Sequence, residues 1–168
     1  PTDGALRFAD LNGDGLSDLI YANGTLTGYR YSGGAARSRK ICKYLRKREV
    51  SPGLIIASPA VRAAETARLF AEELNYPAEN ILIEPRIYSG NEEDIWSILF
   101  ELKDDMGSVM IVGHNPLITH MANHFLQEKL DYLPTSGVAA FSFHTDKWTE
   151  LVLAERTNDF VIYPKMLT

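Results

Sequence analysis

Residues 54–67 read LIIASPAVRAAETA and residues 109–116 read VMIVGHNP, and these two stretches decide the fold. Each begins with an unbroken apolar run, which is typical of a strand covered on both faces. Each run is followed at once by residues that open a helical pattern. Because ligands of parallel sheets bind beyond the carboxyl ends of the strands, we expect Ser58 and Gly113 to lie at the edge that binds a ligand.

The same alternation continues on both sides of these stretches. We expect further strands at 81–83, 138–143, 151–153 and 160–162. Amphipathic helices are expected at 39–48, 60–74, 94–102 and 117–126. Such an alternation predicts an α/β fold, a three-layer sandwich with a mostly parallel central sheet flanked by helices.

The bulk composition limits the class of protein. With 168 residues, of which 45% are hydrophobic, the chain is long enough for one domain with a substantial core. Its net charge of -5 argues against a general nucleic-acid binder. Cys42 is the only cysteine, so no internal disulfide is expected. No run approaches the roughly 20 apolar residues of a membrane span, and we expect a cytoplasmic protein without a membrane partner.

Two side chains at the predicted edge can act on a phosphoryl group. Arg62 lies one turn into the helix after the strand at 54–57, where a guanidinium can form bidentate bonds to phosphate oxygens beside the positive end of the helix dipole. His114 directly follows the strand at 109–112, and Pro116 occupies a first-turn position where its missing N–H costs nothing. Taken singly, Arg62 could be a solvated surface residue and His114 a helix cap.

The spacing of these residues resembles a known family. Ser-Pro-Ala-x-Arg-Ala-x-x-Thr-Ala at 58–67, followed by Gly-His-Asn-Pro at 113–116, is similar to the histidine phosphatase superfamily, which includes the phosphoglycerate mutases. The most similar branch is that of the small SixA-type phosphohistidine phosphatases. The stretches EPRIY at 84–88 and LPTSGV at 133–138 add to the resemblance, which covers about residues 37–168.

This resemblance implies roles for the residues. Arg62, Ser58 and Asn115 would bind the phosphoryl group of the substrate, and His114 would stabilise that group during transfer. Glu84 is a candidate for acid–base work, although a structural role is the more natural one. The family's chemistry needs no metal or other cofactor, and the implied partner is a phosphohistidine-bearing signalling protein.

The nucleophile of that family is missing from this sequence. Family members attack phosphorus with a first histidine, in an Arg-His-Gly or Arg-His-Ala motif at the end of the first strand. No Arg-His pair occurs here, and the histidines at 114, 120, 124 and 144 all lie after that region. His120 and His124 have a zinc-binding spacing, but without an HExxH motif they are expected to be ordinary surface residues. We therefore expect a domain with little or no activity.

The first 32 residues have a different character. Asp10, Asn12, Asp14 and Asp18 occupy positions 1, 3, 5 and 9 of a loop with glycine at position 6, a spacing that can bind Ca²⁺. Position 12 is Tyr21 rather than the glutamate of an EF-hand, and the segment resembles a single FG-GAP or VCBS-type calcium-binding repeat. Because one such repeat cannot bury its own face, a polar turn with at most weak calcium affinity is the alternative.

These observations predict a seam near Gly33-Gly34, between a repeat fragment with its linker at 1–36 and a histidine phosphatase-like domain at 37–168. In the family the first strand is central, and without it the sheet would have unpaired edges. The run LIYA at 19–22 is the only apolar run before the first helix. We expect it to replace the missing strand and to place Asn23-Gly24 near the position of the Arg-His-Gly motif.

Three functions are open on the sequence alone. The chain could be a SixA-like phosphatase, a phosphate-binding pseudoenzyme that keeps Arg62 and His114, or a calcium-binding module formed by residues 10–18. The stretch at 37–48 contains seven Lys or Arg residues, but it lies on an amphipathic helix and is expected to be a solvated face rather than a nucleic-acid site.

Overall fold

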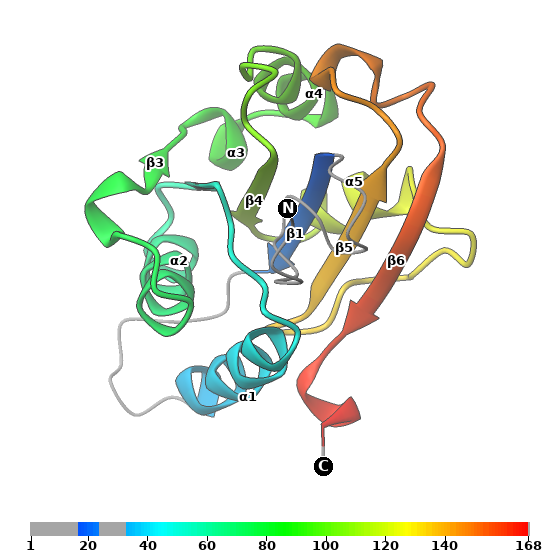
Figure 1. The fold of residues 1–168 in the computed structure, drawn as a ribbon. Coiled ribbons are helices and arrows are strands. Elements are labelled where there is room, and N and C mark those ends of the chain that lie inside the picture. The colour runs from blue at the N-terminus through cyan, green and yellow to red at the C-terminus, as the bar shows by residue number, and fades with distance from the viewer. Residues whose placement is uncertain (1–16, 24–32, 168) are drawn as a thin grey trace.

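The computed structural model describes residues 17–23 and 33–167. In this part of the chain a six-stranded sheet has the order β3-β2-β4-β1-β5-β6 (Figure 1). Its strands are β1 Ser17–Asn23, β2 Leu54–Ala57, β3 Leu82–Ile83, β4 Ser108–Gly113, β5 Val138–Phe143 and β6 Arg156–Ile162. Neighbours among β1 to β4 pair in parallel, whereas β5 runs antiparallel to both β1 and β6. The predicted mostly parallel sheet is therefore confirmed.

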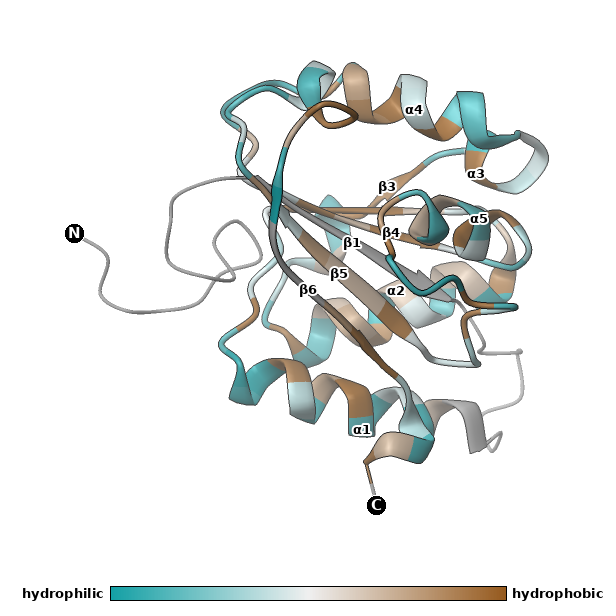
Figure 2. Cartoon of the chain, turned by 90° about the vertical axis from the view of Figure 1, so that its right-hand side faces the viewer, coloured by the Kyte–Doolittle hydropathy of each residue, from teal (hydrophilic) through white to brown (hydrophobic). Residues whose placement is uncertain are grey.

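Helices cover both faces of this sheet. They are α1 Gly33–Lys47, α2 Val61–Glu73, α3 Arg86–Ser89, α4 Glu92–Phe100 and α5 Leu117–Asn123, with short 3₁₀ helices η1 Ala78–Asn80, η2 Trp148–Glu150 and η3 Pro164–Met166. Figure 2 shows α1 and α2 on one side and α4 on the other. None of the helices in the described ranges is long and apolar enough to cross a membrane.

Two hydrophobic cores follow from the alternation of side chains along the strands. Ile55 and Met110 pack with α1 and α2, while their neighbours Ile56 and Ile111 pack with α4 and α5. Cys42 belongs to the first core and is fully buried, and burial raises the pKa of its thiol to about 12. The cysteine is therefore an uncharged core residue rather than a reactive thiolate.

Strand β1 fills the centre of the sheet, as predicted for the run at 19–22. Its Ile20 lies opposite Met110 of β4 on one side and Ala140 of β5 on the other. At the carboxyl end of β1, Asn23 is in register with Gly113. The central slot is thus occupied by a strand that ends in asparagine.

The calcium-site prediction is outside what the structure tests. Asp10, Asn12 and Asp14 lie outside the described residues, and Asp18 belongs to β1, with its Cα opposite Ser108 and Ser142. Within the described ranges no group of three His, Cys, Asp or Glu side chains could hold a metal ion. A calcium-binding repeat at the N-terminus stays a prediction.

Two sequence-based expectations about elements need correction. Residues 151–153 form a turn after η2 rather than a strand, because only Leu151 is buried, whereas Leu153 is 91% exposed. The first helix begins at Gly33, at the predicted seam, instead of residue 39. Strand β3 has only two residues, and both side chains are exposed because the strand lies at the edge of the sheet.

Candidate functional site

The carboxyl ends of the parallel strands meet at one edge of the sheet. Ala57 of β2 lies opposite Val112 of β4 and Ile83 of β3, so Ser58, Glu84 and the residues after Gly113 leave the sheet side by side. The predicted convergence of the segments that carry Arg62 and His114 is therefore present in the strand register.

Ser58 builds the turn that leads to Arg62. It is fully buried, its backbone N–H donates to the Val112 carbonyl at 2.9 Å, and its Oγ accepts from the Ala60 N–H at 3.2 Å. Helix α2 then begins at Val61, so Arg62 stands in its first turn with an exposed side chain. The helix dipole and the first backbone N–H groups favour an anion at this position.

His114 leaves β4 through a glycine that permits close packing. A Cβ on Gly113 would lie 2.8 Å from Ile118 Cδ1 and 3.0 Å from Ile87 Cγ2. The glycine therefore lets β4 run tightly against α5 and α3. The ring of His114 meets Tyr88 edge-on with 5.7 Å between the centroids.

The two ring nitrogens of His114 differ in their surroundings. Its Nδ1 lies 3.4 Å from the Asn115 carbonyl, which can only accept, so Nδ1 carries a proton in that contact. Its Nε2 is buried and has no hydrogen-bond partner among the described residues. An unsatisfied buried polar atom costs free energy, and a ligand atom that hydrogen-bonds to Nε2 would remove that cost.

A pocket of about 290 Å³ lies next to this ring. Its walls include His114, Tyr88 and Gly90 together with Glu92 and His120 from α4 and α5. Glu92 contacts His120 of α5 and His124, the residue directly after this helix, with His120 Nδ1 at 3.6 Å from Oε1 and His124 Nε2 paired with Oε2. Both histidines are exposed, as predicted, but their shared carboxylate was not foreseen, because Glu92 lies 32 residues before His124.

Asn115 holds two loops together. Its Nδ2 donates to the Leu133 carbonyl at 2.9 Å, and its Oδ1 accepts from Thr119 Oγ1 at 2.5 Å. Thr119 Oγ1 in turn accepts from the Leu133 N–H at 2.8 Å. These bonds fix the segment before β5 to the turn that carries His114. A direct contact between Asn115 and substrate stays a prediction.

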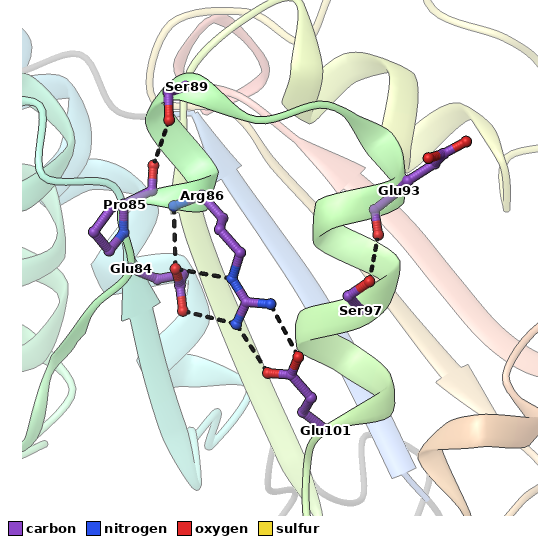
Figure 3. A network of polar contacts seen from close by, with 7 residues as sticks. All are labelled: Glu84, Pro85, Arg86, Ser89, Glu93, Ser97 and Glu101. Atoms are coloured by element: carbon purple, nitrogen blue, oxygen red, sulfur yellow. Dashed lines mark hydrogen bonds and ion pairs between the residues drawn. The ribbon is translucent and has the colours of Figure 1, made fainter.

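Glu84 belongs to an ion-pair network rather than standing free (Figure 3). Its carboxylate accepts from Arg86 Nε at 3.1 Å and Nη2 at 3.0 Å. The same guanidinium donates to both carboxylate oxygens of Glu101, at 3.0 and 2.9 Å. Hydrogen bonding to Arg86 lowers the pKa of both glutamates. A carboxylate held in its ionised form is a poor proton donor, which favours the structural role of Glu84.

Replacing Arg86 with glutamine is expected to weaken the acid dependence of stability. Because the folded-state pKa values of Glu84 and Glu101 are lowered, their contribution is present above the ordinary value of 4.5 and is lost as the pH falls below it. As the pH falls below 5, the free energy of unfolding should therefore decrease less in the variant than in the parent chain. Urea denaturation at a series of pH values measures this decrease. Arg68→Gln is the control. Equal slopes of the free energy of unfolding against pH in the parent chain and in Arg86→Gln would contradict the role of the network.

Comparison with known proteins places this geometry in a fold. No family model and no curated protein matches the sequence. The structure of the protein histidine phosphatase SixA complexed with tungstate matches with a TM-score of 0.71 and 17% identity, over 90% of this chain and 99% of that chain. A mycobacterial glucosyl-3-phosphoglycerate phosphatase matches with a TM-score of 0.60 and 14% identity, over 88% and 97% of the chains.

Phosphoglycerate mutase from Plasmodium falciparum matches with a TM-score of 0.56 and 14% identity, over 84% of this chain and 89% of that chain. The chain therefore has the α/β fold that these proteins share, across nearly their whole length. At these identities the similarity concerns the fold, and the chemistry depends on the residues at the sheet edge.

Proposed function

We propose that this domain binds the phosphoryl group of a phosphorylated substrate at the carboxyl edge of its sheet and hydrolyses it little or not at all. The observation that carries this proposal is the end of β1. The strand occupies the central slot, pairs on both sides, and places Asn23 in register with Gly113, directly before His114. The position next to His114 is therefore taken by a residue that cannot form a phosphohistidine.

The retained residues support binding. Arg62 can donate to two oxygens of a phosphoryl group, and charge-assisted hydrogen bonds of this kind are about twice as strong as neutral ones. His114 can supply a further donor through Nε2, the buried nitrogen without a partner among the described residues. The similar SixA protein was solved with tungstate, and the mycobacterial phosphatase also with VO3, both oxyanions of the phosphate type.

Without a nucleophilic histidine the covalent route has no first step. In that step a ring nitrogen forms the bond to phosphorus while the leaving group departs with its electron pair. The amide nitrogen of asparagine has no lone pair as nucleophilic as that of an imidazole nitrogen. Any hydrolysis would then require direct attack of water on phosphorus. We expect binding to persist because electrostatic stabilisation depends on Arg62 and His114 rather than on the missing group.

Titration with orthovanadate tests the binding half of this proposal. Isothermal calorimetry should give one site per chain, and His114→Ala should weaken the affinity about tenfold, the usual effect of one charge-assisted hydrogen bond. His144→Ala is the matched control, because His144 is exposed and lies after β5, at the opposite edge of the sheet. A cooperatively folded chain that binds no vanadate would refute the proposal.

A further inference from the structure

A second cavity lies at the same edge of the sheet, on the side of β5 and β6. Its volume is about 450 Å³, and it is lined by Arg37 of α1, by residues 132, 134 and 135 before β5, and by residues 163–165 after β6. We call it the cationic cleft. In Figure 1 α1, the segment before β5 and the segment after β6 gather at one end of the sheet.

The charge of this cleft is opposite to that of the chain. Among the described residues, the charged ones that line it are Arg37 and Lys165, both exposed, and none is a carboxylate. Neither cation forms an ion pair within the described part of the chain. The hydroxyls of Tyr132, Tyr163 and Thr135 can also donate hydrogen bonds. In a chain with a net charge of -5, such a concentration of donors fits an anionic ligand.

The cleft is built onto the candidate phosphoryl site. Ala22 of β1 lies opposite Val138 of β5, and Val138 lies opposite Ile162 of β6, so the cleft begins where these strands reach the shared edge. Ser38 of α1 and Ser136 are joined by a buried hydrogen bond of 3.0 Å between their hydroxyls. The hydrogen bond from Asn115 Nδ2 to the Leu133 carbonyl links the same segment to the turn that carries His114.

The distance between the two sites suits one extended peptide. From β4 to β6 there are three strand spacings, which together measure about 14 Å. An extended peptide advances about 3.3–3.6 Å per residue, so four residues span the gap. A residue four positions from a phosphorylated one could therefore reach the cleft while the phosphoryl group lies between Arg62 and His114.

We propose that the cationic cleft binds a carboxylate side chain of the phosphorylated protein, about four residues from the phosphorylated position. This inference rests on the proposed function, because it takes the phosphoryl group to lie beside His114. It narrows the substrate class to phosphorylated proteins with an acidic flank. A cleft with only two cations is too small in charge for a nucleic-acid surface, which needs many phosphate contacts.

Peptides that carry a hydrolysis-resistant phosphohistidine analogue test this inference. One peptide carries Asp, and the other Asn, at the positions four residues before and four residues after the analogue. They are otherwise identical, and both are titrated into the full chain. The Asp peptide should bind about tenfold more tightly, the effect of one charge-assisted contact. The variant Arg37→Glu/Lys165→Glu should lose this preference and still bind vanadate with unchanged affinity.

The control variant is Lys40→Glu/Lys43→Glu, which makes the same charge change at exposed positions of α1 outside the cleft. It should keep the preference for Asp. Vanadate binding with equal affinity for the Asp and Asn peptides would overturn the cleft and leave the phosphoryl site standing. If the parent chain bound no vanadate but still preferred the Asp peptide, the phosphoryl site alone would be overturned. A preference that the control variant also loses would show a general charge effect and overturn the cleft.

Discussion

Ile20→Pro is expected to unfold the domain, or to lower its free energy of unfolding by about 3 kcal/mol or more. Ile20 lies in the central strand, opposite Met110 on one side and Ala140 on the other. Proline removes the backbone N–H and leaves a carbonyl of a neighbouring strand without its donor, which is why proline is confined to edge strands and bulges. Chemical denaturation followed by circular dichroism measures the loss. For a domain of this size, such a loss is a large fraction of the total stability.

Ile83→Pro is the matched control. Ile83 belongs to the two-residue edge strand β3 and is 44% exposed. Its N–H faces away from β2, because the N–H of the next residue, Glu84, donates to the Ala57 carbonyl of β2. Proline is tolerated at such a position of an edge strand, so this variant should lose less than about 1.5 kcal/mol. If Ile20→Pro instead melted like the parent chain, residues 17–23 would not form the central strand, and Asn23 would not stand beside Gly113 as we propose.

Arg62→Ala is expected to weaken orthovanadate binding roughly 10- to 100-fold, because hydrogen bonds to charged groups are worth about 1.5–3 kcal/mol. The side chain is exposed and stands in the first turn of α2. Its removal should therefore leave the melting curve nearly unchanged. Calorimetric titration at constant ionic strength measures the affinity, since surface electrostatics weaken with salt.

The comparison that makes this result specific is Arg68→Ala. Arg68 is exposed on the same helix, six positions further along the chain, and its loss changes the net charge equally. We expect the affinity of Arg68→Ala for vanadate to stay within about twofold of the parent chain. The charge of Arg68 is screened by salt, and we do not expect it to contact the bound ion. Equal weakening in both variants would mean that Arg62 acts only through net charge.

Much of the fold follows from short-range patterns in the sequence. The strands at 54–57 and 138–143 lie where the apolar runs predicted them, because buried central strands need continuous hydrophobic residues. The run at 19–22 was the only apolar segment available for the vacant slot, and β1 fills it. The run at 151–153 misled because three apolar residues cannot distinguish a strand from a turn with one buried side chain.

The candidate site was predicted only in part. The segments of Arg62 and His114 were placed together because both follow parallel strands that are neighbours in the sheet. The network of Arg86 with Glu84 and Glu101 could not be foreseen, because it depends on how α4 packs against the turn before α3. The cationic cleft could not be foreseen either, because Arg37 and Lys165 come to line it only through the packing of α1 next to η3.

Phosphatase turnover, measured with a phosphohistidine peptide and an aryl phosphate, tests most directly whether the fold binds phosphoryl groups without a nucleophile. The assay uses the chain, His114→Ala and a parallel vanadate titration on the same samples. We predict that the cooperatively folded chain binds vanadate and gives no turnover above that of His114→Ala. Turnover that the parent chain shows and His114→Ala loses would contradict this prediction and would mean that a working nucleophile is present.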